Sequence, residues 1–548
     1  MVLVQRWVWP LWRRALLAAA VIGPLWLVPA AASHAQRSLP SMGDGADMTT
    51  SDERRLGDRI IRELYRDPDY IDDPILNEYV QTLFQQLLKA ARERGELSQE
   101  LEERFAWEVL LGRDRTVNAF ALPGGYFGVH LGLVGVVSTR DELASVLAHE
   151  LSHVTQRHIS RLIAQQNRQT PLMLGALVLG ALAASKNPEA AQAMMVGGQA
   201  LAVQNQLNFS RDMEREADRV GYGLMAPAGF APQGFVSMFD KLQQANRIND
   251  NGSWPYLRSH PLTSQRIADM HSRIPPGAQA APPPTLEHAM MAARARVLMR
   301  PGVDAWRQWE AEPRSAGFAA RPVAQRAAGW YAAVLSAVQL QDVAQARDGL
   351  KGLDEAVQSD APAMRQARLL AAEVDMAAGD APAAALRLAP RPVTAAASRT
   401  ALTAADLGLG DSAPVASGAR QSRDQNAAPG GTGRPELVLR TQALLRTGAS
   451  AEMTGPLQNW VASHPRDAGI WQLLAGVWQQ QGQSLRAVRA EAEAQAARYD
   501  YAAAVDRFKA GQDLSRKSAA AADYIEASII DTRLRDMQAK LKEQAAER

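Results

Sequence analysis

The stretch "HELSH" at residues 149–153 constrains this chain more than any other feature. It lies in "LASVLAHELSHVTQRHISRL", whose apolar residues recur at helical spacing. His149 and His153 are four residues apart, so both project from one helix face, where two imidazoles can bind a single metal ion. Glu150 follows the first histidine and can reach a water molecule at that metal as a general base. The alternative is an ordinary helix that carries a polar patch.

A catalytic zinc ion needs a third protein ligand and an open position for water. The stretch "NFSRDMEREADRVG" at residues 208–221 offers Glu214 and Asp218, again four residues apart on an expected helix. We expect Glu214 to bind the metal and Asp218 to accept a hydrogen bond from a ligand histidine. Taken alone, this stretch is more typical of a solvated helix face with mixed charges than of a metal site. Together with HELSH it predicts a complete site for one Zn²⁺ ion per chain.

Two further histidines are not expected to bind the metal. His158 lies nine residues after His149, which is half a turn around a continuous helix, so it should point away from the site. His130 lies in a strand-like stretch, where a structural role is the simpler interpretation.

Residues 49–273 alternate helical and strand-like patterns, which predicts an α+β domain that is mostly helical and contains a small sheet. The strand-like stretches are 105–114 and 117–137, the second interrupted by a Pro-Gly-Gly turn. Thr139 is the expected N-cap of the HELSH helix, and Glu142 three residues later completes a capping box.

The C-terminal part of the chain predicts an all-α region. Residues 274–320 form a Pro-rich linker and a connecting helix, and 321–548 is helical, with an insert at 390–435 whose composition predicts disorder. One segment matches the tetratricopeptide pattern in part, although an Ala-rich helical hairpin would look similar. The matching positions are Trp471, Leu474, Ala475, Trp478, Ala487 and Ala494.

The N-terminus has the layout of a secretory signal peptide. Residues 1–35 carry three arginines, an apolar run and a small-residue cleavage pattern, and 36–48 read as a flexible lead-in. A retained membrane anchor is the alternative, but Gly and Pro residues interrupt the run. The remaining chain carries a net charge of −1 and no cysteine, which suits a periplasmic bacterial protein and gives no indication of nucleic-acid binding.

A second apolar run, "PLMLGALVLGALAA" at residues 171–184, is too short to span a bilayer with confidence. We expect a lid helix near the site, and weak peripheral contact with a membrane is the other interpretation.

Four segments together resemble the HtpX-like and CAAX-prenyl-protease-like family of zinc metallopeptidases. They are "NAFALPGG" at 118–125, HELSH, "SRDMEREAD" at 210–218 and "SHPLTSQRI" at 259–267. The resemblance implies a zincin-like metallopeptidase domain over 49–273, followed in the periplasmic branch of the family by tetratricopeptide-like repeats.

The resemblance also assigns roles to residues. It makes His149, His153 and Glu214 the zinc ligands, Glu150 the base and Asp218 the residue that supports a ligand. It places His260 either as an extra, inhibitory ligand or opposite the reacting carbonyl group. The strand that holds Asn118, Ala119 and Phe120 would be the edge along which a substrate backbone pairs.

The resemblance implies a periplasmic zinc endopeptidase of a Gram-negative bacterium, which could be peripheral to the outer membrane. Its clients would be unfolded or misassembled outer-membrane β-barrel proteins, and its partner would be their assembly machinery. The alternative is a chaperone or scaffold that works through the repeat domain, with proteolysis latent.

Overall fold

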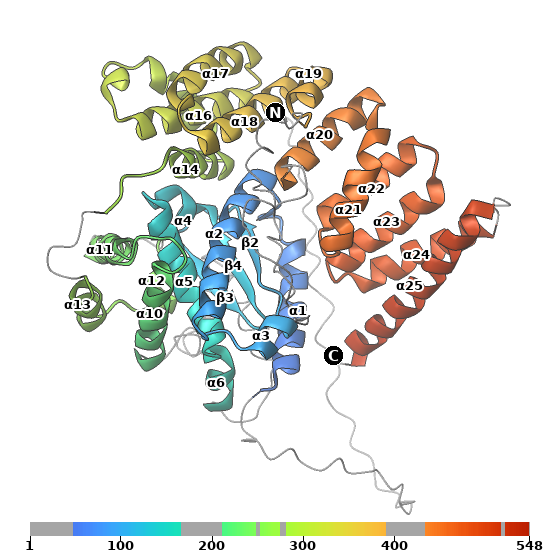
Figure 1. Ribbon diagram of the computed structural model, residues 1–548, viewed down its shortest axis with the longest axis horizontal. Helices are drawn as coiled ribbons and strands as arrows, with labels where there is room; N and C mark the ends of the chain where they lie inside the picture. The colour runs from blue at the N-terminus through green and yellow to red at the C-terminus, as the bar shows by residue number, and fades with distance from the viewer. Residues whose placement is uncertain are drawn as a thin grey trace, which may run out of the picture. The chain divides into compact units, whose positions relative to one another are not determined.

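The computed structural model describes residues 48–165, 211–247, 253–274, 281–390, 433–516 and 521–546. The expected signal peptide, the run at 171–184 and most of the 390–435 insert lie outside these residues. The described helices and strands follow in chain order (Figure 1): α1 (Thr50–Arg66), β1 (Tyr70–Ile71), α2 (Pro74–Glu93), α3 (Gln99–Arg104), β2 (Glu108–Gly112), β3 (Ala119–Leu122), β4 (Tyr126–His130), α4 (Leu131–Val136), α5 (Arg140–Thr155), α6 (His158–Gln165), α10 (Arg211–Met225), α11 (Gln233–Arg247), α12 (Tyr256–Ser259), α13 (Ser264–Ser272), α14 (Leu286–Leu298), α15 (Val303–Ala311), η1 (Glu312–Arg314), η2 (Phe318–Ala320), α16 (Val323–Gln339), α17 (Val343–Val357), α18 (Ala361–Ala377), α19 (Ala381–Arg387), α20 (Arg434–Thr447), η5 (Ser450–Met453), α21 (Thr454–Ser463), α22 (Ala468–Gln480), α23 (Ser484–Ala497), α24 (Tyr501–Ser515) and α25 (Ala521–Ala546).

The N-terminal part is the expected α+β fold with a small sheet. Its four strands lie in the order β1-β2-β4-β3, with β2 and β4 parallel and the two outer pairs antiparallel. Strand β3 pairs only with β4 in this sheet, so its second edge is free of strand pairing. This edge matters because it lies beside the helix that carries HELSH.

Successive side chains of each strand point to opposite faces of the sheet. Both faces carry apolar residues, and helices cover both of them (Figure 1). On one face, Val109, Phe127 and Val129 pack in the same hydrophobic core as residues of α2 and α5. On the other face, Leu110 and Tyr126 pack against the buried leucine and isoleucines of α1. Helix α5 therefore lies directly under the sheet and is buried along almost its whole length.

The start of α5 confirms the expected capping box. The Thr139 side chain accepts a hydrogen bond from the Glu142 N–H over 3.1 Å. The Glu142 carboxylate in turn accepts one from the Ser138 N–H over 2.6 Å, one residue earlier than the standard box. These bonds satisfy backbone donors that a helix start would otherwise leave unpaired, and they fix where α5 begins.

The strand-like pattern over 117–137 is correct for β3 and β4 but wrong for its last part. Residues Leu131–Val136 form helix α4, and all but its last two residues are buried. An apolar run of this length has no periodicity that separates a buried strand from a buried helix turn. Between β3 and β4 the expected turn is present, with Gly124 and Gly125 at φ of 77° and 79°, a region that glycine adopts most readily.

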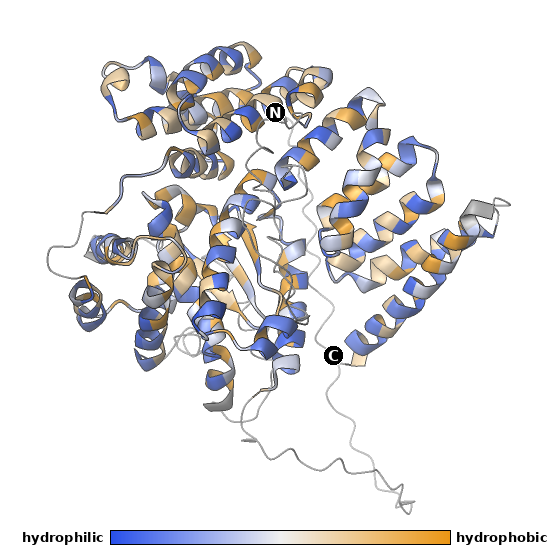
Figure 2. Cartoon of the chain, in the orientation of Figure 1, coloured by the Kyte–Doolittle hydropathy of each residue, from blue (hydrophilic) through white to orange (hydrophobic). Residues whose placement is uncertain are grey.

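The C-terminal part consists of paired helices, as expected for helical repeats. Consecutive helices pack against each other from α16 to α18 and again from α22 to α25. The six positions that match the tetratricopeptide pattern lie on α22 and α23 and are buried: Trp471, Leu474, Ala475, Trp478, Ala487 and Ala494. Figure 2 shows hydrophobic residues concentrated in the central strands, while the helices carry both kinds of residue.

A buried arginine ties the two parts together. Arg294 on α14 donates to both carboxylate oxygens of Asp73, the N-cap of α2, over 2.8 and 2.6 Å. It also donates to Glu373 on α18 and to the Tyr331 hydroxyl on α16. Its guanidinium donors thus connect the N-terminal α+β part to the C-terminal helices.

No helix among the described residues is both long enough and apolar enough to cross a bilayer.

Candidate metal centre

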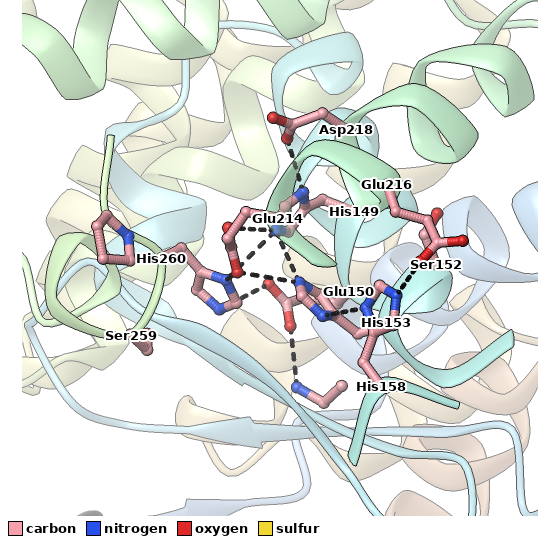
Figure 3. Close-up of polar contacts among 12 residues, drawn as sticks. His149, Glu150, Ser152, His153, His158, Glu214, Glu216, Asp218, Ser259 and His260 are labelled. Carbon is pink, nitrogen blue, oxygen red and sulfur yellow. Dashed lines mark hydrogen bonds and ion pairs between the residues drawn. The ribbon is translucent and has the colours of Figure 1, made fainter. Parts of the chain in front are cut away.

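Three segments bring the predicted site residues together (Figure 3). Helix α5 carries His149, Glu150 and His153, helix α10 carries Glu214 and Asp218, and His260 directly follows the short helix α12. Helices α5 and α10 pack closely because α10 has a glycine at the crossing. A Cβ on Gly221 would lie 3.0 Å from the carbonyl atoms of Ala148. This close approach lets the carboxylates of α10 reach the histidines of α5.

Four side chains form a group of metal-ligating atoms in the described part of the chain. His149, His153, Glu214 and His260 are all buried, and one ligand atom from each lies within 4.8 Å of the others. The separations are 3.0 Å between the Nε2 atoms of His149 and His153, and 3.3 Å from His149 Nε2 to His260 Nδ1. Glu214 oxygens lie 3.4, 3.5 and 3.0 Å from the ligand nitrogens of His149, His153 and His260.

These distances fit a tetrahedral zinc ion. Two ligands at the usual zinc distance of about 2.0–2.1 Å, at a tetrahedral angle, are about 3.3 Å apart. Glu214 Oε2 is buried, and outside the ligand group it forms an ion pair with Arg266 Nη1 over 2.8 Å. A cation among the ligand atoms would complete the partners of this carboxylate and separate the facing nitrogen and oxygen lone pairs. The donor set of imidazoles and a carboxylate is one that zinc prefers.

Asp218 and Arg266 hold the first ligand. Asp218 Oδ1 lies 3.0 Å from His149 Nδ1, so it can accept the proton of that nitrogen and leave Nε2 for the metal. Arg266 donates to both Asp218 oxygens over 2.6 and 2.8 Å, and to the carbonyl of Pro261 next to His260. The sequence had offered no role for Arg266.

The electrostatics agree with this geometry. Burial opposes the charge of Asp218, but the hydrogen bonds and charge of Arg266 outweigh it and keep the pKa of Asp218 below its ordinary value. Burial likewise disfavours a charged His149, yet its hydrogen bonds to Asp218 and Glu214 raise its pKa to about 9. A proton and a zinc ion would therefore compete for the Nε2 of His149.

Glu150 is buried beside the ligand group, and it contacts the sheet. Its Oε2 accepts a hydrogen bond from the backbone N–H of Ala121 in β3 over 3.0 Å (Figure 3). Its Oε1 lies 3.4 Å from His260 Nε2. Burial raises the pKa of Glu150, and the neighbouring His260 and His149 oppose that rise. A carboxyl group with a raised pKa is suited to accepting and returning a proton.

In the predicted substrate strand, the backbone N–H and C=O groups of successive residues point to opposite edges. The Asn118 carbonyl accepts a hydrogen bond from the His130 N–H, so the backbone groups of Asn118 point toward β4. Phe120 lies two residues after Asn118 and pairs with Gly128, so its backbone groups also point toward β4. Ala119 and Ala121 consequently point their backbone groups to the free edge. Of these two, Ala119 was predicted to contact substrate and is buried, whereas Ala121 was not predicted and is partly exposed.

The two other histidines lie outside the ligand group. His130 Nδ1 hydrogen-bonds the Thr116 hydroxyl over 2.8 Å, in agreement with a structural role. His158 does not continue α5, which ends at Thr155, but begins α6. Its Nδ1 lies 2.9 Å from His153 Nδ1, so the prediction that it points away from the site is wrong.

Tyr256, four residues before His260, is a site residue that the sequence did not reveal. It is buried, and its ring lies 4.6 Å from that of His260 between centroids. An apolar pocket adjoins the group on this side, lined by Tyr256, His149, His260 and hydrophobic residues of α5 and α11. Only the tertiary fold brings Tyr256 to the site, so no local pattern marks it.

Two histidines of an HExxH helix, a carboxylate from a second helix and an edge strand over the motif define the chain as a metallopeptidase. Its residues 74–274 match the model of peptidase family M48.

Curated relatives agree with this assignment. The chain is 36% identical over 303 residues to a beta-barrel assembly-enhancing protease of Vibrio cholerae, a match that covers 53% of this chain and 58% of the relative. It is 34% identical over 260 residues to the protein of that name from Escherichia coli (strain K12), covering 47% and 51%. The mitochondrial metalloendopeptidase OMA1 of Saccharomyces cerevisiae is 27% identical over 203 residues, covering 36% and 55%. The chain therefore matches little more than half the length of these relatives.

Proposed function

We propose that this protein is a zinc-dependent endopeptidase of the periplasm that degrades misassembled outer-membrane β-barrel proteins and assists their assembly. The observation that carries the proposal is the buried group of His149, His153, Glu214 and His260, whose ligand atoms lie within 4.8 Å of one another. The sequence pattern of residues 1–35 supports export, and the names of the relatives support β-barrel assembly.

The residues divide the chemistry among them. A zinc ion, when bound, polarises the scissile carbonyl group and lowers the pKa of the attacking water. His149, His153 and Glu214 would hold it. Glu150 takes the proton from the attacking water and returns it to the leaving amine, and the Ala121 N–H fixes one of its oxygens. Asp218 and Arg266 keep His149 turned toward the metal.

The free edge of β3 suits the proposed clients. A β-barrel protein that has not closed its sheet exposes strands with unpaired backbone groups. Such a strand can add to the edge beside Ala121, which is partly exposed, and this places the backbone of the strand next to Glu150. Recognition through main-chain hydrogen bonds would accept many sequences, provided that the client is extended.

The second candidate function is that of a chaperone or scaffold with latent proteolysis. The observation in its favour is His260, whose Nδ1 lies 3.0 Å from Glu214 within the ligand group. Four protein ligands would close the zinc coordination and leave no position for water. The paired helices of the C-terminal region would then recruit clients without cleavage.

Cleavage of an unfolded protein such as casein separates the two candidates. We expect the wild-type protein to cleave, and Glu150→Gln to keep its metal and fold but lose nearly all cleavage, since an amide cannot accept the proton. Cleavage by Glu150→Gln at the wild-type rate would refute the mechanism. Wild-type protein that binds zinc but never cleaves, even with clients present, would favour the scaffold. Proteins trapped by Glu150→Gln in its own cells would then identify the clients.

A further inference from the structure

A chain of three side chains leads from the metal group toward the surface through His158. His153 Nδ1 lies 2.9 Å from His158 Nδ1, and His158 Nε2 lies 3.0 Å from Glu216 Oε2 on α10 (Figure 3). Arg161 donates to the same Glu216 oxygen over 2.8 Å. His153 and His158 are fully buried, whereas Glu216 is partly exposed.

The directions of these hydrogen bonds follow from the metal site. His153 turns its Nε2 toward the other ligand atoms, so the proton of the neutral ring belongs on Nδ1. That N–H can donate to His158 only if the Nδ1 of His158 accepts. The proton of His158 must then lie on Nε2, from which it donates to the Glu216 carboxylate. A single arrangement of protons thus satisfies all three groups.

A local break in the helix puts His158 in this place. Helix α5 ends at Thr155, and Arg157 adopts a φ of 52°, which is unusual for a residue with a side chain. The turn redirects the chain so that α6 begins at His158 and the His158 ring returns to His153, with 4.9 Å between the ring centroids. On a continuous helix these two rings could not meet edge to edge in this way.

We propose that His158 is a positioning residue that holds His153 in the proton arrangement that metal binding needs, with Glu216 as its anchor. The proposal rests on the metal site of the proposed function. Helix α10 then supports both α5 ligands: Asp218 acts on His149 directly, and Glu216 acts on His153 through His158. Partners of this kind orient a ligand imidazole and increase its basicity.

The competing explanation is that His158 only fills space in the core. Zinc affinity separates the two, measured by competition with a chromophoric chelator on the full-length mature protein. His158→Phe keeps an aromatic ring but cannot accept a hydrogen bond. His158→Asn places its side-chain oxygen near the position of Nδ1 and can accept one. His271→Phe is the matched control, because His271 also pairs with a carboxylate, that of Asp240, but lies exposed on α13.

We expect His158→Phe to weaken zinc binding about 10- to 100-fold, a typical loss for a partner of a metal ligand. His158→Asn should recover part of this loss, and His271→Phe should bind like wild type. A structural role would lower the melting temperatures of the metal-free and zinc-bound forms equally and leave affinity unchanged. Wild-type affinity in His158→Phe, or equal losses in the Phe and Asn variants, would overturn the proposal.

A second pair of variants avoids the core altogether. Glu216→Ala and Asp212→Ala each remove one acidic group from α10, and Asp212 is exposed. The proposal predicts a clear loss of zinc affinity for Glu216→Ala and little change for Asp212→Ala, while equal affinities would contradict it. A wild-type protein that binds no zinc would instead overturn the proposed function, and the inference with it.

Discussion

The backbone N–H of Ala121 donates a hydrogen bond to the carboxylate of Glu150 over 3.0 Å. This contact joins the free edge of the sheet to the residue that we expect to act as the base. Substrate pairing and proton transfer would thus occur at neighbouring atoms, so a client that adds to β3 arrives where Glu150 can act on it.

Ala121→Pro tests this contact, because proline lacks the N–H that Glu150 accepts. The N–H of Ala121 points away from β4, so the pairing of β3 with β4 should survive, as proline is tolerated on edge strands. We expect normal zinc content and a loss of cleavage of about 100-fold, the scale of a base displaced by about 1 Å. Phe120→Pro is the control, since it removes a donor on the β4 side and should lower the melting temperature instead. Full activity in a folded Ala121→Pro protein would show that the contact is dispensable.

His260→Ala distinguishes two roles for that histidine. If His260 closes the metal coordination, its removal opens a position for water and raises basal cleavage of an unfolded substrate. If it instead stabilises the charge that develops on the reacting carbonyl, its removal raises the activation free energy by a few kcal/mol. Cleavage would then be slower by about 100-fold or more. Its position 3.0 Å from Glu214 favours the first role. A hundredfold loss in a variant that keeps its zinc would contradict the latch.

Arg294 offers a test of the coupling between the peptidase core and the helical region. Its removal leaves the carboxylates of Asp73 and Glu373 without their buried partner. We expect Arg294→Ala to lower the free energy of unfolding by about 3–5 kcal/mol, the usual result of breaking a buried ion pair. Lys351→Ala removes an exposed partner of Asp348 and should change stability by less than about 1 kcal/mol. Similar chemical denaturation curves for both variants would show that Arg294 does not hold the two parts together.

His288 on α14 should make stability depend on pH. Its Nδ1 accepts from the Tyr79 hydroxyl over 2.7 Å, and its Nε2 donates to the Val137 carbonyl over 3.1 Å. Burial lowers its pKa from 6.5 to about 4 in the folded protein. Above pH 6.5 both states are neutral at this residue. Below pH 6.5 the unfolded chain binds a proton at this residue and the folded chain does not. The free energy of unfolding therefore decreases as the pH falls from about 6.5 to 4.

The size of this effect follows from the shift in pKa, which corresponds to about 3 kcal/mol at its full extent. Unfolding of the metal-free protein by urea at pH 7, 6 and 5 measures it, and the difference between wild type and His288→Gln isolates this residue, because the other histidines titrate in both proteins. His288→Gln should show a flatter decline than wild type across this range. Parallel declines would place the pH dependence in other residues.

Much of the site could be predicted from local sequence patterns. The pattern of HELSH and its capping box specify one helix, and a second pair four residues apart specifies the partner carboxylates. Residues His149, His153, Glu214 and Asp218 meet because each pair has helical spacing, which a sequence shows directly.

The remaining features depend on backbone events and long-range packing. His158 would point away from the site on a continuous helix, but the left-handed conformation of Arg157 interrupts the helix before it. Helix α4 was indistinguishable from a strand because its residues are nearly all apolar. Ala121 and Arg266 contact residues that lie far away in the sequence. The spacing of residues along the chain does not show which partner a backbone N–H or a guanidinium group will contact.

The central claim is that the buried histidines bind a zinc ion, and the metal content of the purified mature protein tests it most directly. Elemental analysis of wild type should give one zinc per chain, because two imidazoles and a carboxylate converge on one point. The double variant His149→Ala, His153→Ala should contain almost none, and His271→Ala, which changes an exposed histidine, should match wild type. Wild-type protein without zinc, or a double variant that retains it, would contradict the account.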